Sequence, residues 1–110
     1  MKEQRKYIRV PVDRPVMVVL SNGSEVKTKM INISVEGLAV LHPAPAEIGT
    51  ELGFIFTLPC KSGFFEVNVK GVVRHYHLQG VNYYIGIELT NVSAHDRGII
   101  DEFVALKCRY

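Results

Sequence analysis

The sequence predicts an all-β domain in which a small antiparallel barrel is followed by one C-terminal helix. Short apolar stretches rich in Val and Ile recur between residues 16 and 89, and turn-forming Asn, Gly and Pro residues separate them. Apolar residues at helical spacing occur only near the end of the 110-residue chain. Five or six short strands in an open sheet would leave exposed edges, and closure into a barrel removes those edges.

Two strands joined by a tight turn are expected first. Val16–Leu20 is apolar and β-branched, and Glu25–Ile33 follows Asn22-Gly23, the dipeptide typical of a short hairpin turn. Ser34–Gly37 then interrupts the strand pattern. The remaining strands are expected at Leu38–Leu41, Leu52–Leu58, Phe64–Tyr76 and Tyr83–Leu89, with a last loop at His77–Asn82.

The terminal segment, about residues 93–107, is expected to form the helix. Ser93, followed three residues later by Asp96, resembles a capping box at a helix N-terminus. Ile99, Ile100 and Phe103 recur at helical spacing. One apolar face of this helix should therefore pack on the sheet.

Positive charge is concentrated at the N-terminus. Residues 1–14 contain five basic and two acidic side chains, whereas the remaining 96 residues contain eight basic and nine acidic ones. Pro11 and Pro15 disfavour a helix where this segment meets the first strand. We therefore expect a flexible basic arm over residues 1–13 and a barrel with its C-terminal helix over residues 14–110.

Composition and motif content exclude several classes of protein. No apolar stretch is long enough to cross a bilayer and no export signal is recognisable, so we expect a cytoplasmic protein without membrane insertion. Cys60 and Cys108 lie far apart and are expected to be reduced thiols. No catalytic motif is present, which indicates a domain that is not an enzyme. His75 and His77 share a strand face without a third ligand, so neither a metal nor a cofactor is predicted.

Two short patterns combine residues suited to binding a nucleotide. Arg5 and Arg9 are spaced R-x-x-x-R, and each guanidinium can hold a phosphate or the O6 and N7 acceptors of guanine. Asn32, Ser34 and Gly37 form [DN]-x-S-x-x-G at the turn between two strands. The amide and the hydroxyl can bond to a base edge, and the glycine permits a positive φ or a close backbone approach. The same turn can also be purely structural, satisfied by its own Asn and Ser side chains.

Together the two patterns resemble the PilZ domain family. Val69–Arg74 and Tyr84–Leu89 are similar to later barrel strands of that family, and the terminal helix also fits, so the resemblance covers nearly the whole chain with no appended domain. It implies a six-stranded antiparallel barrel acting as a stand-alone receptor for cyclic di-GMP, a bacterial second messenger of two guanosines joined by two phosphodiesters. The ligand-binding positions that match the family are Arg5, Arg9, Asn32, Ser34 and Gly37.

The resemblance also leads to a hypothesis for signalling. The dianionic ligand would bridge the N-terminal arm and the barrel turn, order the arm, and so form or mask a surface for an unidentified partner protein. Lys6, Arg14 and Arg74 are accessory candidates for electrostatic contacts with the ligand.

Two alternatives remain at this point. The domain could be a protein-interaction module that does not need the nucleotide. It could also be a small nucleic-acid-binding barrel in which exposed aromatic residues stack on bases, the available rings being Phe54, Phe56, Phe64 and Phe65. The slightly acidic balance outside the arm disfavours nucleic acid, because a long anionic ligand requires a basic surface.

Overall fold

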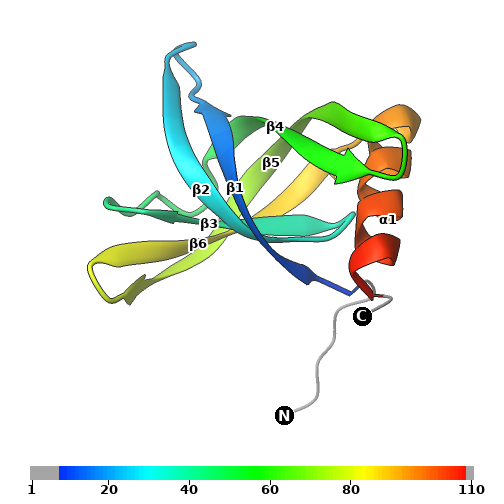
Figure 1. Cartoon of the computed structure of the whole chain (residues 1–110). Helices are drawn as coiled ribbons and strands as arrows, with labels where there is room; N and C mark the ends of the chain where they lie inside the picture. The colour runs from blue at the N-terminus through cyan, green and yellow to red at the C-terminus, as the bar shows by residue number, and fades with distance from the viewer. Residues whose placement is uncertain (1–7, 109–110) are drawn as a thin grey trace.

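The computed structural model describes residues 8–108 and contains one closed β-barrel and one helix (Figure 1). All strand pairs are antiparallel, and the order around the barrel is β1-β2-β3-β6-β5-β4. The predicted six-stranded antiparallel barrel with a C-terminal helix is therefore confirmed. The elements are β1 Val10–Val19, β2 Glu25–Ile33, β3 Gly37–His42, β4 Glu51–Cys60, β5 Gly63–Gln79, β6 Asn82–Asn91 and α1 Ala94–Cys108.

The first hairpin forms at the predicted dipeptide. Gly23 has a φ of 88°, a conformation that glycine adopts without steric cost. The Ser24 backbone N–H donates a hydrogen bond of 2.9 Å to Asn22 Oδ1, which holds the turn between β1 and β2. The strands then pair directly, with Val18 opposite Val26.

Strand β1 begins earlier than the sequence pattern suggests. It starts at Val10, and Val10 and Pro11 pair with Ile33 and Asn32 of β2 as part of the barrel. The pairing register shifts between Pro11 and Arg14. Such a shift accommodates a proline in a strand, because proline has no N–H to donate to the ladder. The residue before the strand, Arg9, is consequently held close to the barrel.

The hairpin between β5 and β6 is longer than predicted, and the expected loop at His77–Asn82 is wrong. Strand pairing continues to Gln79 opposite Asn82, and the turn uses Gly80 with a φ of 64°. His77 lies opposite Tyr84 in this extension. The alternation signal fails here because consecutive side chains near the end of β5 are exposed on both faces.

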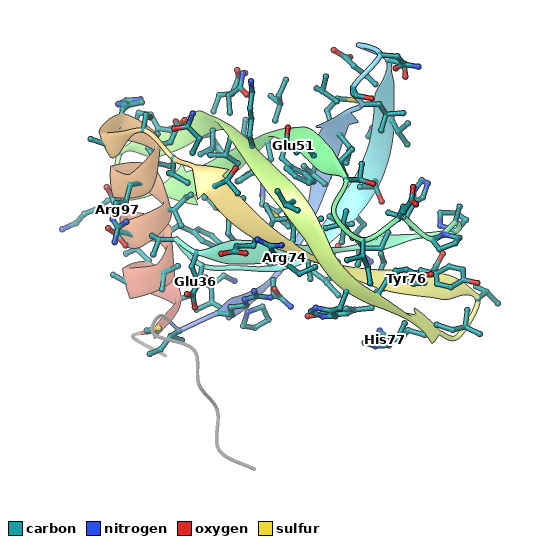
Figure 2. All side chains as sticks on the ribbon, turned by 180° about the vertical axis from the view of Figure 1, so that it is seen from behind. Glu36, Glu51, Arg74, Tyr76, His77 and Arg97 are labelled. Atoms are coloured by element: carbon teal, nitrogen blue, oxygen red, sulfur yellow. The ribbon has the colours of Figure 1, made fainter. Side chains whose placement is uncertain are left out.

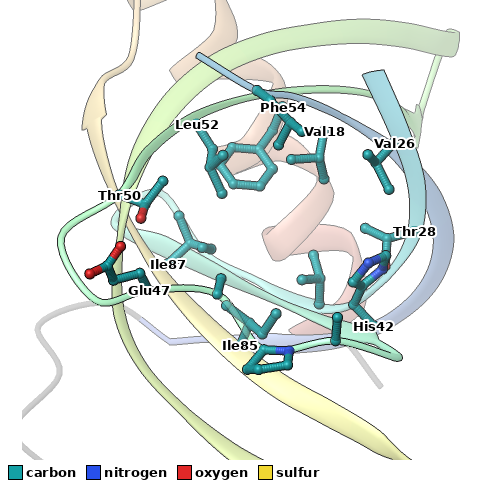
Figure 3. Close-up of a pocket in the computed structure, with 15 residues that line it drawn as sticks. Val18, Val26, Thr28, His42, Glu47, Thr50, Leu52, Phe54, Ile85 and Ile87 are labelled. Carbon is teal, nitrogen blue, oxygen red and sulfur yellow. The ribbon is translucent and has the colours of Figure 1, made fainter. Parts of the chain in front are cut away.

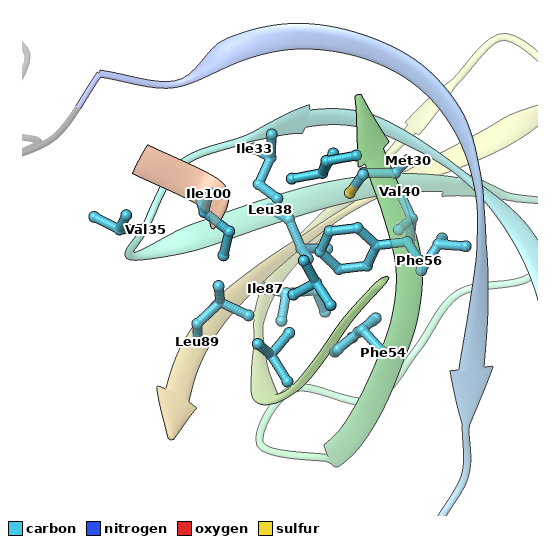
Figure 4. Close-up of a cluster of buried hydrophobic side chains, with 14 of the residues drawn as sticks. Met30, Ile33, Val35, Leu38, Val40, Phe54, Phe56, Ile87, Leu89 and Ile100 are labelled. Atoms are coloured by element: carbon cyan, nitrogen blue, oxygen red, sulfur yellow. The ribbon is translucent and has the colours of Figure 1, made fainter. Parts of the chain in front are cut away.

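The barrel interior is filled by apolar side chains from all six strands and from α1 (Figure 4). Phe54, Leu38 and Ile100 are fully buried, and Ile100 extends from the helix into this core. The helix packs against β1, β4 and β5. Its N-terminus is capped by Ser93, whose Oγ accepts a hydrogen bond of 3.1 Å from the Asp96 N–H, as the sequence pattern predicts.

A cavity of about 280 Å³ opens into the barrel near the segment between β3 and β4 (Figure 3). Its walls are mainly apolar and include Val18, Phe54 and Ile87, with Glu47 and Thr50 among its polar lining residues. None of the ligand-binding residues predicted from the sequence lines it. The predicted ligand-binding residues therefore lie elsewhere on the barrel.

Packing of α1 on the barrel can be tested with Ile100→Ala. Removing a fully buried side chain should lower the free energy of unfolding by about 2–5 kcal/mol, because apolar burial is lost and a cavity remains. Ile48→Ala is the matched control, since Ile48 is 60% exposed and its truncation should change stability by less than about 0.5 kcal/mol. Urea denaturation measures both. Equal stability of the two variants would contradict the packing described.

Candidate functional site

The turn between β2 and β3 is closed by its own serine. The Ser34 N–H donates to the Gly37 carbonyl at 2.8 Å, and Ser34 Oγ accepts a 3.2 Å hydrogen bond from the Glu36 N–H. Ser34 has an exposed fraction of 0%. The Glu36 carbonyl accepts a 3.0 Å hydrogen bond from the Leu89 N–H, which attaches the turn to β6. Ser34 therefore shapes the turn from within.

Gly37 brings the two sequence patterns together. A Cβ at this position would collide with Arg9 Nη2 and would lie 2.6 Å from the Ile87 carbonyl oxygen. Its φ is not positive, so close approach rather than backbone conformation requires glycine here. The Arg9 guanidinium thus lies directly against the backbone of β3, as expected if the two patterns form one site.

Asn32 lies on the same outer face of the barrel. Its neighbour Ile33 is buried in the core, and because side chains alternate along a strand, Asn32 points outward. Asn32 Nδ2 donates a hydrogen bond of 3.2 Å to the Tyr84 hydroxyl. Asn32 Oδ1 is buried and has no hydrogen-bond partner within residues 8–108. The amide thus has one satisfied end and one free acceptor.

Three aromatic rings, His75, His77 and Tyr84, lie together on the outside of β5 and β6 and are called the aromatic group below. The ring centroids of His77 and Tyr84 are 4.8 Å apart with an interplanar angle of 12°, and those of His75 and Tyr84 are 5.8 Å apart at 21°. A Cβ at Gly86 would meet His75 Nε2 at 2.6 Å, so the glycine lets this ring lie flat on β6. The histidine pair proposed from the sequence thus stacks on Tyr84.

Tyr84 was not identified as a site residue from the sequence. A signal was present, because Tyr84 and Gly86 are two residues apart on one strand and so share a face. Its contact with Asn32 spans 52 positions in the chain, however, and depends on β3 lying between β2 and β6. Local sequence patterns contain no information on that pairing order.

Two accessory candidates occupy different places. Arg74 Nε pairs with Glu88 Oε1 at 2.5 Å, and Glu88 lies opposite Gly37 across the β3–β6 ladder, so Arg74 is close to the candidate site. Figure 2 shows Arg74 along β5, with His77 nearer the end of that strand. Arg14 Nε instead donates to the Thr57 carbonyl at 2.8 Å, on the side of β1 that faces β4.

Arg14 is further held by an aromatic side chain. Its Cζ lies 5.3 Å from the centroid of the Phe64 ring. The structure therefore does not bring Arg14 together with Asn32 and Gly37. Arg5 and Lys6, which the sequence also suggested, lie outside the described residues.

The described residues were also compared with the requirements for a reactive thiol, a metal site and a membrane-spanning helix, and they meet none of these. Partial burial and, to a smaller extent, the Glu102 carboxylate raise the pKa of the Cys60 thiol, so this thiol stays protonated and poorly nucleophilic at neutral pH. No three His, Cys, Asp or Glu side chains of the described chain cluster as a metal site would require. No helix in that range has the length and apolar character needed to cross a membrane.

Residues 3–106 match the PilZ domain. The chain belongs to the PilZ domain family. PilZ domains are a family of cyclic di-GMP receptors and are non-catalytic receptor or adaptor modules, so the prediction that this chain is not an enzyme is confirmed at the level of the family. A comparison with curated proteins gives no match.

Solved structures of PilZ proteins have the same fold as this chain. The Bacillus subtilis inhibitor of motility MotI/DgrA superposes with a TM-score of 0.85 at 20% identity, over 98% of this chain and 53% of that chain. The PilZ domain of YcgR from Escherichia coli, solved with cyclic di-GMP, superposes with a TM-score of 0.69 at 14% identity, over 97% of this chain and 93% of that chain. PlzA of Borreliella burgdorferi, in complex with cyclic di-GMP, superposes with a TM-score of 0.68 at 18% identity, over 91% of this chain and 40% of that chain. This PilZ domain thus spans about half of the length of MotI/DgrA.

The requirement for glycine in the turn is testable with Gly37→Ala. The added Cβ would force Arg9 or β6 to move, and such overpacking costs about 1–3 kcal/mol of unfolding free energy. Gly98→Ala is the control, because the added methyl on α1 meets nothing within 4 Å and alanine favours a helix by up to about 1 kcal/mol. Urea denaturation should show loss of stability only for Gly37→Ala. A Gly37→Ala protein as stable as the parent would contradict the close approach.

Proposed function

We propose that this PilZ domain is a cyclic di-GMP receptor that binds its ligand on the outer face of the barrel. Arg9, Asn32, Ser34 and Gly37 form the core of the site, and Arg5 joins them from the N-terminal arm. One observation supports this most strongly. The Arg9 guanidinium is packed on Gly37, so two patterns more than twenty residues apart in the chain meet at one turn.

The chemistry of the ligand suits these residues. Cyclic di-GMP has two phosphodiester charges and two guanines, and an arginine fork can bind a phosphate or the O6 and N7 edge of guanine. Asn32 offers a buried free acceptor to the N–H groups of a guanine. Ser34 acts by holding the turn, because its hydroxyl is already bonded to the Glu36 N–H. Arg74 lies beside the site as an accessory contact, and it is already paired with Glu88, so the two side chains together add no net charge.

Signalling then follows because the site combines residues of the N-terminal arm with residues of the turn between β2 and β3. Binding fixes the N-terminal arm, including Arg5 and Lys6, against a barrel that itself changes little. Fixing each arm residue costs about 1–2 kcal/mol, which charge-assisted contacts with the phosphates must exceed. The face formed by arm and ligand is recognised by a partner protein in the cytoplasm.

A second candidate function is a protein-interaction module that needs no nucleotide. It is favoured by one observation, the apolar tip of the β5–β6 hairpin, where Leu78 is 63% and Val81 is 88% exposed. Base stacking has less support, because Phe54 and Phe56 are buried in the barrel core and the exposed Phe64 ring is packed against the Arg14 guanidinium. The slightly acidic balance outside the N-terminal arm also disfavours a nucleic acid.

Titration calorimetry with cyclic di-GMP tests the proposal. The protein should bind with a dissociation constant in the micromolar range or below, about 8 kcal/mol at 1 μM. Arg9→Ala should weaken binding by about 10- to 100-fold, because a charge-assisted hydrogen bond is lost. The variant should remain folded, since Arg9 lies before the first strand and its truncation removes the contact with Gly37 without adding a clash.

Arg97→Ala is the matched control for loss of an arginine. Arg97 lies on α1, where it pairs with Asp101 at 3.9 Å, and its removal should leave the affinity unchanged. Absence of binding by the parent protein, or equal binding by Arg9→Ala, would overturn the proposal. Either result would place the interaction-module function first.

A further inference from the structure

The two ends of the barrel are closed differently. At the end where β4 finishes, α1 packs over the barrel, and the Lys61 N–H donates a hydrogen bond of 2.8 Å to Glu102 of the helix. The cavity of about 280 Å³ lies toward the other end, because Leu52 and Phe54 at the start of β4 line it (Figure 3). We propose that this cavity is a second ligand-binding site, which takes a small alkyl amine with its chain inside the barrel and its ammonium group at Glu47.

The composition of the walls separates this cavity from the proposed cyclic di-GMP site. Among the described lining residues, four are polar: Thr28, His42, Glu47 and Thr50. None of the described lining residues is an arginine or a lysine, the side chains that bind phosphates, so a nucleotide does not fit here. Ile85 lines the cavity, whereas its neighbour Tyr84 belongs to the aromatic group on the outside of the barrel. The two sites therefore lie on opposite faces of the same strand.

The size of the cavity indicates how large its ligand is. Close-packed protein interiors contain few voids larger than a water molecule, so an apolar cavity of about 280 Å³ is more than a packing defect. A cavity of about 150 Å³ already holds benzene, whereas sites for drug-sized molecules begin at about 300 Å³. Aliphatic side chains from several strands, such as Val18, Val40 and Ile87, make up the walls. An unbranched alkyl chain suits such walls, because it gains from apolar burial and needs no hydrogen-bond partner.

The polar side chains at the rim determine the head group of the ligand. Figure 3 shows Glu47 beside Thr50 on one side of the cavity and His42 beside Thr28 on the other. The Thr28 hydroxyl already donates to the Leu41 carbonyl at 2.6 Å. Glu47 is exposed, and within residues 8–108 no ion pair occupies its carboxylate. A carboxylate attracts an ammonium group and repels another carboxylate, so an alkyl amine is favoured over a fatty acid.

Titration calorimetry with three eight-carbon probes, octylamine, octanol and octanoate, tests the proposal. At about pH 8, where a free histidine is neutral and a primary amine is protonated, octylamine should bind with a dissociation constant below about 1 mM. Octanoate should bind about three- to tenfold more weakly, because the exposed carboxylate attracts one head group and repels the other. Shortening the amine by one methylene should weaken binding about fourfold, the loss expected for one buried CH₂. Absence of saturable octylamine binding, or stronger binding of octanoate, would overturn the proposal.

Glu47→Gln tests the role assigned to the carboxylate. The variant keeps the size of the side chain and removes its charge, so octylamine and octanoate should bind with affinities within about twofold of each other. The affinity for octanol should stay unchanged, because the apolar walls are intact. Glu51→Gln is the matched control and should retain the preference for the amine, since Glu51 is exposed at the start of β4 and does not line the cavity. A preference that persists in Glu47→Gln would overturn the assignment.

Methyl ¹H–¹³C spectra locate the alkyl chain directly, and they do not depend on whether cyclic di-GMP binds. On addition of octylamine, the largest shifts should occur at Ile85 and Ile87, which line the cavity. Ile99 and Ile100, which are buried where α1 packs on the barrel, should stay in place. Shifts at the exposed Leu78 with none at Ile85 and Ile87 would show adsorption to the hairpin tip and overturn the cavity site.

Discussion

The missing side chain at Gly37 is the constraint on which the rest of the site depends. Three parts of the chain meet at this residue: the Arg9 guanidinium before β1, the backbone of β3, and the Ile87 carbonyl of β6. The serine-closed turn sets the start of β3, and the β3–β6 pairing then places Tyr84 within reach of Asn32. A single methyl group at Gly37 would disturb these contacts. The added carbon would lie only 2.6 Å from the Ile87 carbonyl oxygen, and close-packed protein interiors have no spare volume to absorb it.

The barrel could be predicted from the sequence because its core strands alternate clearly and its turns use residues with strong conformational preferences. Val16–Leu20 and Asn22-Gly23 formed the expected hairpin, and Ser93 capped the expected helix. The extension of β5 through His77 was missed since its side chains are exposed on both faces, and exposed strands have no hydrophobic period.

The candidate site could be predicted only in part from the sequence. Residue types and spacing identified Arg9, Asn32 and Gly37, because charge and hydrogen-bonding capacity are local properties. Tyr84 required knowledge of which strands are neighbours, as did the different positions of Arg14 and Arg74. Ladder order is a property of the closed barrel, and no short segment of the sequence encodes it.

The central claim is that cyclic di-GMP binds the outer face around Asn32 and Gly37, and chemical-shift mapping of the ¹⁵N-labelled protein with this dinucleotide tests it most directly. The account predicts that the largest changes occur at Asn32, Gly37 and Tyr84, with Ile100 in the helix core unaffected. Changes centred on the cavity residues Val18 and Phe54, or no changes at saturating ligand, would contradict it.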